Sequence, residues 1–363
     1  MNKFFLSSLI LVILLSGCSL YVPKSEVRFQ TSDFSNNAMN YPRYQEISQP
    51  AGFINTPPVT IGELVGKKVV LIDFLTYTCI NCIRTFPFLN ALYDKYKDQG
   101  LEVIGIHTPE FAFERKYDNV VMAMEKYGIK FPIVLDNEYG TWNAYGNQYW
   151  PRKYLIDIDG NIVYDHIGEG GYEETEAKVQ ELLTERMARL GEKDGMKKEM
   201  INPVDIGARG LIDQTRPRSP ETYFGALRNE FFGNGRPGVI GVQSLDLPKT
   251  IQRDTLYLVG DWDIQGEYAT NQSAHASIIY RYRGSHVYIV AYAEEDNTVQ
   301  VLRDGERLGE VKGDDVRVLS DGLEIVPIKE DRLYTIVNGE YGEHTLQLEI
   351  DEPGLRLFAF TFG

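Results

Sequence analysis

Two cysteines three positions apart carry the most direct chemical signal in this chain of 363 residues. Cys79 and Cys82 lie in the segment from Tyr77 to Thr85, which reads YTCINCIRT. Thiols at this spacing can exchange with a disulfide, because one thiolate attacks a disulfide sulfur and the other thiol then resolves the mixed disulfide. The spacing therefore predicts redox chemistry at Cys79 and Cys82, and this chemistry requires no cofactor.

The sequence on either side of the pair indicates which thiol attacks. Residues 69–75 are apolar apart from one Asp, as in a strand buried on both faces, and residues 80–97 carry apolar side chains at helical spacing. Cys79 would then lie at a helix N-terminus, where unsatisfied N–H groups and the helix dipole favour a thiolate. We predict that Cys79 attacks and that Cys82, one turn further in and more shielded, resolves.

Two structural interpretations compete with this chemistry. A four-cysteine zinc site would need more thiols than the three in the chain, and no two of the five histidines are three to five residues apart. A structural disulfide could form in an oxidising compartment, although so small a loop would add little stability through chain entropy. The sequence therefore favours catalysis and predicts no metal site. It does not exclude a structural disulfide between the two cysteines.

A carboxylate interrupts the strand that leads to the cysteines. Asp73 lies six residues before Cys79. Burial of a carboxylate is costly unless the group is partnered or protonated, so burial would raise the pKa of Asp73. Asp73 could then accept the Cys82 proton while this thiol attacks. The alternative is that Asp73 faces solvent at the end of the strand.

Strands and helices alternate over residues 46–188. The patterns predict strands at 101–106 and 131–135 and a helix at 119–127. Two further strands, at 152–156 and 161–167, flank the turn signal Asp159-Gly160 and should form a hairpin. A helix at 172–186 follows the hairpin. Pro151 precedes the first hairpin strand, where a residue without an N–H group fits. The order predicts an α/β fold, with a mixed central sheet and helices on both faces.

Residues 216–363 change to β character. Strands are predicted at 286–292, 298–303, 346–350 and 355–362. Several short strands separated by turn signals are typical of a β-sandwich. We therefore predict two domains, at 46–188 and 216–363, with a linker at 189–215 whose prolines and charges fit neither pattern.

The chain begins with an apolar run that is too short to cross a bilayer as a helix. Lys3, the apolar residues 4–15 and the tetrad Leu15-Ser16-Gly17-Cys18 resemble a signal peptide that ends in a bacterial lipobox. This resemblance implies cleavage before Cys18 and lipidation of its sulfur, with residues 19–45 as a tether. A signal peptide with a coincidental cysteine, or an uncleaved anchor, is the alternative.

The overall charge narrows the class of partner. The formal net charge is −15, which disfavours nucleic acid and anionic membrane surfaces because both would repel the chain. Apolar residues make up 43% of the sequence and charged residues 25%, as in packed globular domains. We expect protein or neutral ligands and no nucleic acid.

Taken together, these motifs resemble the thioredoxin superfamily, and specifically its extracytoplasmic TlpA-like, redoxin-type branch. Asp73, the Cys79–Cys82 pair, Pro87 and Trp150-Pro151 match that family's buried acid, redox pair, helix-kinking proline and cis-proline. YTCINCIRT, HTPEFAFE at 107–114, SPETYFG at 219–225 and FAFTFG at 358–363 resemble the periplasmic portion of DipZ-type thiol-disulfide interchange proteins. The resemblance covers nearly everything after residue 50.

The resemblance implies a thioredoxin-like domain, followed by a jelly-roll β-sandwich similar to a carbohydrate-binding module. It implies an extracytoplasmic thiol-disulfide oxidoreductase in which Trp150 and Pro151 contact substrate. DipZ-type proteins carry a membrane domain ahead of this portion, whereas this chain offers a lipid anchor, which implies a separate membrane electron donor of the CcdA type. Ile80-Asn81 lacks the histidine of strongly oxidising relatives and favours a reductase of envelope protein disulfides.

Two other functions stay open at this point. The same fold supports peroxide reduction, although Cys82 lies one turn after Cys79, unlike the peroxidatic TxxC arrangement. A surface-tethered module that binds glycan through the β domain is the third interpretation, with Trp262, Tyr268, Tyr280 and Tyr282 as aromatic candidates for a sugar platform or for the core.

Overall fold

The computed structural model describes residues 41–193, 195, 197–202 and 216–363. The predicted signal peptide with Cys18, most of the tether and residues 203–215 of the linker lie outside the described residues. Within the described ranges, no helix is long and apolar enough to cross a membrane.

The first part of the structure is built on a six-stranded sheet. Its strands are β1 (Gly52–Ile54), β2 (Val69–Leu75), β3 (Leu101–His107), β4 (Ile133–Leu135), β5 (Arg152–Ile156) and β6 (Ile162–Ile167), in the order β1-β4-β3-β2-β5-β6. The central pairs β2–β3 and β3–β4 are parallel, and β1, β5 and β6 pair antiparallel with their neighbours. The predicted mixed sheet is confirmed.

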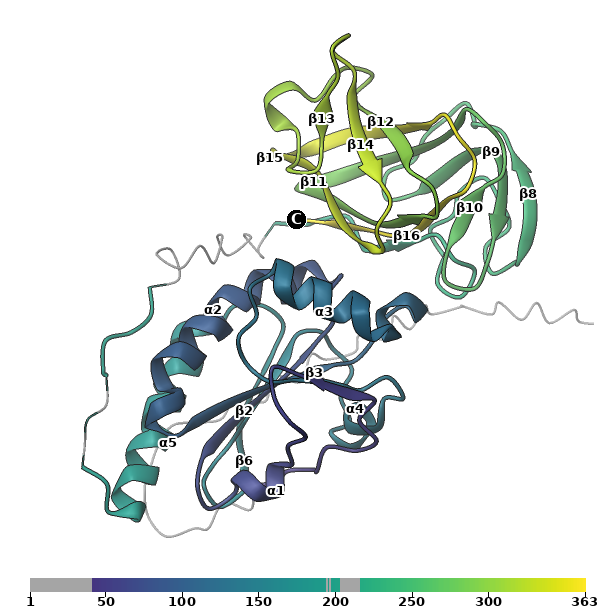
Figure 1. Cartoon of the computed structure of the whole chain (residues 1–363). Helices are drawn as coiled ribbons and strands as arrows, with labels where there is room; N and C mark the ends of the chain where they lie inside the picture. The colour runs from purple at the N-terminus through teal and green to yellow at the C-terminus, as the bar shows by residue number, and fades with distance from the viewer. Residues whose placement is uncertain (1–40, 194, 196, 203–215) are drawn as a thin grey trace, which may run out of the picture. The chain divides into compact units, whose positions relative to one another are not determined.

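Helices cover both faces of this sheet (Figure 1). They are α1 (Ile61–Leu64), α2 (Ile80–Tyr96), α3 (Tyr117–Lys126), α4 (Gly140–Ala144) and α5 (Tyr172–Leu190), with 3-10 turns η1 (Lys97–Gln99) and η2 (Ala112–Arg115). Alternate residues of β2 point to opposite faces. Val69 and Leu71 pack in the same core as α2 and α5, and Val70 and Ile72 pack with Ile61 of α1 on the other face.

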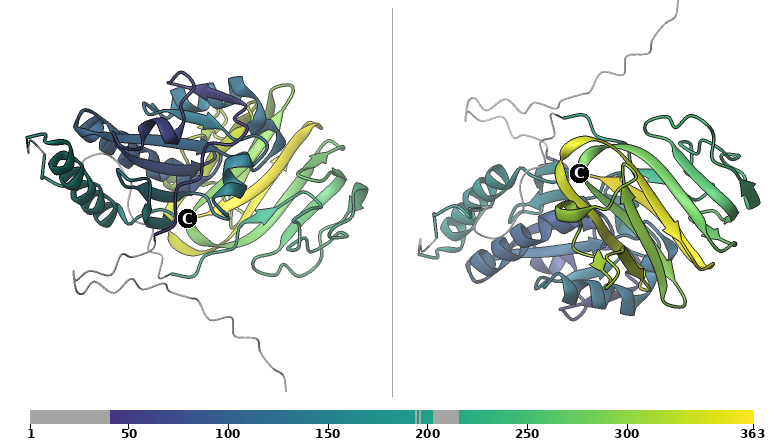
Figure 2. Two further views of the ribbon diagram at one scale, coloured as in Figure 1. Left: turned by 90° about the horizontal axis from the view of Figure 1, so that it is seen from below. Right: turned by 90° about the horizontal axis from the view of Figure 1, so that it is seen from above.

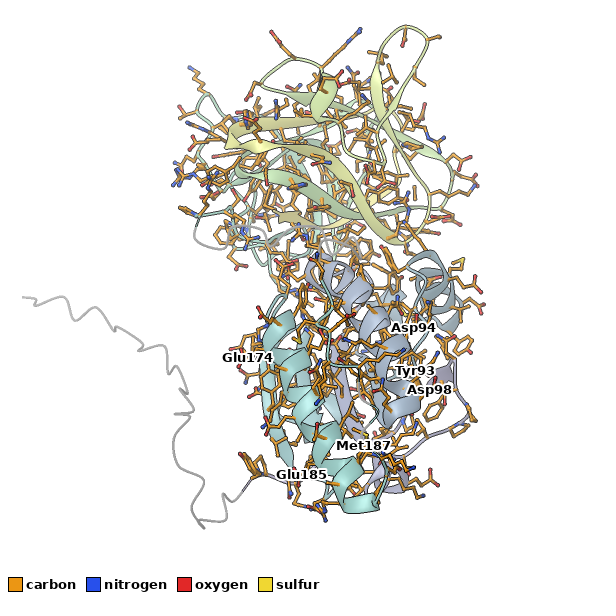
Figure 3. The ribbon with its side chains drawn as sticks, turned by 90° about the vertical axis from the view of Figure 1, so that its left-hand side faces the viewer. Tyr93, Asp94, Asp98, Glu174, Glu185 and Met187 are labelled. Atoms are coloured by element: carbon orange, nitrogen blue, oxygen red, sulfur yellow. The ribbon has the colours of Figure 1, made fainter. Side chains whose placement is uncertain are left out.

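The long helix α5 follows its sequence pattern. In α5 the buried positions include Tyr172, Val179 and Met187, whereas Glu174 and Glu185 are exposed, as Figure 3 shows for the labelled residues. The helix extends to Leu190, four residues beyond the predicted end, and stops where Gly191 adopts the left-handed conformation with φ 68°.

Residues 216–363 form the predicted all-β region. Its strands are β7 (Thr222–Tyr223), β8 (Gly241–Leu245), β9 (Leu256–Ile264), β10 (Ala269–Asn271), β11 (Ala276–Ala293), β12 (Asn297–Arg303), β13 (Arg317–Val318), β14 (Glu324–Ile328), β15 (Arg332–Ile350) and β16 (Leu355–Phe362), with one 3-10 turn, η3 (Gly309–Val311). They hydrogen-bond as one ten-stranded sheet. The long strands β11 and β15 pair over most of their length and can be followed side by side in Figure 2.

Most aromatic candidates for a sugar platform belong to the core of this β region. Trp262, Tyr280 and Tyr282 are at most 1% exposed and pack in one hydrophobic cluster. Tyr268 is partly buried, and the Arg356 guanidinium lies over its ring. Three of the four aromatics therefore serve packing.

The two parts share a hydrophobic core, and residues 41–363 form one compact unit. Phe358 of β16 lies 4.8 Å from Phe113 and 5.2 Å from Phe111, measured between ring centroids. Between β11 and β16 the pairing steps from Val290 with Ala359 to Ala291 with Leu357, which leaves Phe358 as the extra residue of a bulge. The bulge turns this aromatic ring out of the β core and towards η2.

Candidate active site

Cys79 is the residue that caps the start of α2. The strand β2 ends at Leu75, a three-residue loop follows, and α2 begins at Ile80. The N–H of Cys79 donates to the Thr76 carbonyl at 3.4 Å, and its carbonyl accepts from the Ile83 N–H at 3.0 Å. The side chain is partly exposed, and its Sγ lies 3.9 Å from the Trp150 carbonyl oxygen. A substrate sulfur can therefore reach Cys79.

Cys82 lies one turn further along α2 and is fully buried. Both cysteines are free thiols. Burial raises the pKa of the Cys82 thiol well above its usual range, and the neighbouring Cys79 and Asp73 raise it further. Cys82 therefore needs a base before it can act as a nucleophile, whereas Cys79 meets solvent directly. This difference in exposure is the one that the sequence predicts.

Asp73 is fully buried in the middle of the sheet, so it does not face solvent. Burial raises its pKa to about 6, and the charge of Lys153 opposes this rise. The Lys153 Nζ lies 3.7 Å from Asp73 Oδ1, which is an ion-pair distance rather than a hydrogen bond. Neither carboxylate oxygen has a hydrogen-bond partner among the described residues. The lone pairs of Asp73 are therefore available to a proton.

Lys153 is a site residue that the sequence analysis missed. It lies on β5 directly opposite Asp73 of β2 and is fully buried. A lysine in the predicted strand 152–156, directly before the apolar residues 154–156, was the available signal, because a buried lysine needs a partner. The partner could not be named from the sequence, since the pairing of β2 with β5 joins residues 80 positions apart.

Trp150 and Pro151 lie beside the reactive sulfur. Their peptide bond is cis, and it leads directly into β5. The Trp150 ring packs on Trp142 of α4 with 4.3 Å between centroids. The structure thus brings Cys79, Cys82, Asp73 and the Trp150-Pro151 pair to the same end of β2 and the start of α2.

A cavity of about 740 Å³ opens along the first turns of α2. Ile80, Ile83 and Arg84 line it on the helix side, and Tyr288 and Leu333 line it on the β-region side. The Arg84 guanidinium donates to the Tyr288 hydroxyl at 3.0 Å. The β region therefore forms one wall of a cavity beside the first turns of α2, the helix that carries Cys82.

Comparison with known proteins identifies the family of this chain. Residues 55–183 match the family model described as Redoxin, and residues 219–363 match the one described as Thioredoxin like C-terminal domain. The thiol-disulfide oxidoreductase ResA of Bacillus anthracis is 33% identical over 135 residues, which cover 35% of this chain and 75% of ResA. The chain belongs to the thioredoxin-like family of thiol-disulfide oxidoreductases.

A second relative of this thioredoxin-like family extends over both parts of the chain. Protein DipZ of Mycobacterium tuberculosis is 36% identical over 317 residues, which cover 86% of this chain. The chain spans 41% of the length of DipZ. Among solved structures, a thiol:disulfide interchange protein DsbE from Chlorobium tepidum is 23% identical with a TM-score of 0.35, covering 39% of this chain and 96% of that chain.

Proposed function

We propose that this protein is an extracytoplasmic thiol-disulfide oxidoreductase that reduces or exchanges disulfides of cell-envelope proteins. The observation that carries this proposal is the pair of unequal thiols on one helical turn, with Cys79 accessible at the start of α2 and Cys82 buried. The relatives ResA and DipZ support the class of reaction. Cys79, Cys82 and Asp73 are the catalytic residues, and Trp150 and Pro151 contact the substrate.

The reaction proceeds in two exchanges. The Cys79 thiolate attacks a substrate disulfide, forms a mixed disulfide and releases one substrate thiolate. Asp73 then accepts the proton of Cys82, whose thiolate attacks the Cys79 sulfur and releases the second substrate thiolate. The substrate gains two electrons and the protein is left with a Cys79–Cys82 disulfide. A dithiol donor must return these electrons before the next cycle.

The test uses the Cys18→Ser chain, in which only Cys79 and Cys82 can react. We expect this chain to catalyse insulin reduction by dithiothreitol. Cys79→Ser abolishes the activity. Reduced Cys82→Ser, mixed with insulin after dithiothreitol has been removed, accumulates a mixed disulfide that gel electrophoresis without reductant detects. Equal activity in wild type and both variants would refute the proposal.

The direction of electron flow has its own measurement. The dipeptide Ile80-Asn81 supports a reductase. We expect the Cys79/Cys82 couple, equilibrated with glutathione, to lie nearer the potential of thioredoxin at about −270 mV than that of the oxidant DsbA at about −120 mV. Consumption of peroxide by the reduced protein, without insulin reduction, would favour the peroxide-reducing redoxin instead.

The membrane anchor and the electron donor are part of the same proposal. Cys18 is the lipidation site that anchors the chain to a membrane, and a CcdA-type membrane protein supplies electrons. The Cys18→Ser variant should leave the membrane fraction.

We further propose that residues 46–188 and 216–363 are the two domains, joined by residues 189–215. The two matched family models support this division.

A glycan ligand of the β region is a further part of the proposal. A cavity of about 520 Å³ there is lined by Tyr268, Arg356 and several acidic residues, including Asp263 and Glu352. We expect Tyr268→Ala to reduce retention of the full chain on cell-wall glycan if this cavity holds sugar.

A further inference from the structure

Glu114 is a fully buried carboxylate that joins two segments of the chain. Its Oε1 accepts from the hydroxyls of Thr76 and Thr78, each at 2.6 Å, and from the Thr78 N–H at 3.3 Å. Its Oε2 accepts from the N–H groups of Glu110 and Phe111 at 2.5 and 2.9 Å. One side chain therefore receives five donors.

The three donors on the first oxygen come from the loop that carries the reactive cysteine. Residues 76–78 are the whole connection between the end of β2 at Leu75 and Cys79. Besides Glu114, this loop holds Cys79 through the Thr76 carbonyl, which accepts the Cys79 N–H at 3.4 Å. The placement of Cys79 at the start of α2 thus depends on a short loop whose two threonine side chains are both bound to Glu114.

The two donors on the second oxygen come from a segment that the β region holds. The Glu110 carboxylate accepts from Tyr223 and Arg228 at 2.9 and 2.7 Å, and the Ala112 N–H donates to Glu267 at 2.9 Å. One oxygen of Glu114 therefore binds a segment that the β region holds in place, and the other oxygen binds the loop of residues 76–78. Glu176, by comparison, is equally buried but binds Lys95 and Tyr96, away from the cysteine loop.

We propose that Glu114 is a positioning residue, which holds the loop of residues 76–78 and thereby keeps the Cys79 sulfur where it can attack a substrate disulfide. This inference rests on the proposed function. It assigns Glu114 to the first exchange, attack by Cys79, whereas Asp73 serves the second. Substitution of Glu114 should therefore slow one of the two exchanges more than the other.

Ellman's reagent separates the two exchanges in the reduced Cys18→Ser chain. Attack by Cys79 releases one coloured thiolate and leaves a mixed disulfide, and attack by Cys82 on that mixed disulfide releases the second. We expect the first phase to be about tenfold slower in Glu114→Ala, because the loop donors lose their acceptor. The second phase should change less than twofold, and Glu176→Ala should leave both phases unchanged.

Glu114→Gln keeps the test decisive if Glu114→Ala does not fold. The amide oxygen can still accept the N–H groups of Glu110 and Phe111, while the amide N–H₂ can donate to the threonine hydroxyls, so we expect a first-phase rate between those of wild type and Glu114→Ala. A first phase as fast as wild type in the folded variants would overturn the inference. Equal slowing of both phases with a lower melting temperature would also overturn it, because the role would then be structural. If wild type itself shows neither phase, the proposed function fails.

Discussion

At the scale of single residues, two buried carboxylates near the thiols differ in their hydrogen bonds. Glu114 receives five donors, whereas both oxygens of Asp73 lack a hydrogen-bond donor among the described residues and face Lys153 at 3.7 Å. Burial raises the pKa of both carboxyls, to about 7 for Glu114 and about 6 for Asp73, so the pKa does not distinguish them. The hydrogen bonds do, because five donors occupy the lone pairs of Glu114. A proton acceptor needs free lone pairs and a pKa near the working pH, and Asp73 meets both conditions.

The Asp73 carboxyl should control the pH dependence of the second exchange. Its pKa of about 6 means that it is a carboxylate at pH 7.5 and becomes protonated as the pH falls through 6. We therefore expect the second thiolate release from Ellman's reagent to slow below pH 6. Asp73→Asn should slow this release by at least about 100-fold at pH 7.5, the lower end of what a general base contributes, and remove its dependence near pH 6.

Glu176→Gln is the matched control for Asp73→Asn, since it also replaces a fully buried carboxylate. It should keep the wild-type pH profile. A profile of Asp73→Asn that coincides with that of wild type would exclude Asp73 as the proton acceptor.

At the scale of elements, the pairing of β2 with β5 affects the pKa of the Asp73 carboxyl. Lys153 lies opposite Asp73, so the two side chains project from the same face of the sheet, while the neighbouring Arg152 projects from the other face and pairs with Asp165. The nearby positive charge of Lys153 lowers the pKa of Asp73 against the effect of burial. Its removal should leave the burial effect unopposed.

Lys153→Met should therefore raise the pH at which the second exchange reaches half its maximal rate. We expect the midpoint to move upward from about 6 by at least about one pH unit, because an opposite charge at this distance is worth that much. Arg152→Met, which removes a cation from the opposite face, should leave the midpoint unchanged. A midpoint that stays in place in Lys153→Met would show that Lys153 does not act on Asp73.

The elements that carry the thiols could be predicted from the sequence, because their patterns are local. The apolar run at 69–75 and the helical spacing after Ile80 specify β2 and α2 almost to the residue. The short elements β1, α1 and α4 were not predicted, since three to five residues are too few to show a period. Lys153 and Glu114 were missed for another reason: their roles depend on strand register and on contacts between distant segments.

At the scale of the whole molecule, the β region supports the segment that binds the cysteine loop. Phe358 is 3% exposed and packs on Phe111 and Phe113. Glu114 directly follows Phe113 in the turn η2. The Tyr77 hydroxyl in the cysteine loop also donates to the Asp331 carbonyl at 3.2 Å. Changes in the β region should therefore reach the site through this turn.

Phe358→Ala tests this connection. Loss of a buried Phe typically costs about 3 to 5 kcal/mol of unfolding free energy. Here we expect part of that loss to appear as faster hydrogen exchange of the backbone amides at 110–112, measured by mass spectrometry, together with a slower first phase with Ellman's reagent. Phe360→Ala is the matched control, because Phe360 is equally buried on β16 but packs within the β core on Phe224 and Tyr280. It should lower stability by a similar amount and leave both readouts near wild type. If the two variants exchange alike at 110–112, the Phe358 ring does not hold the turn.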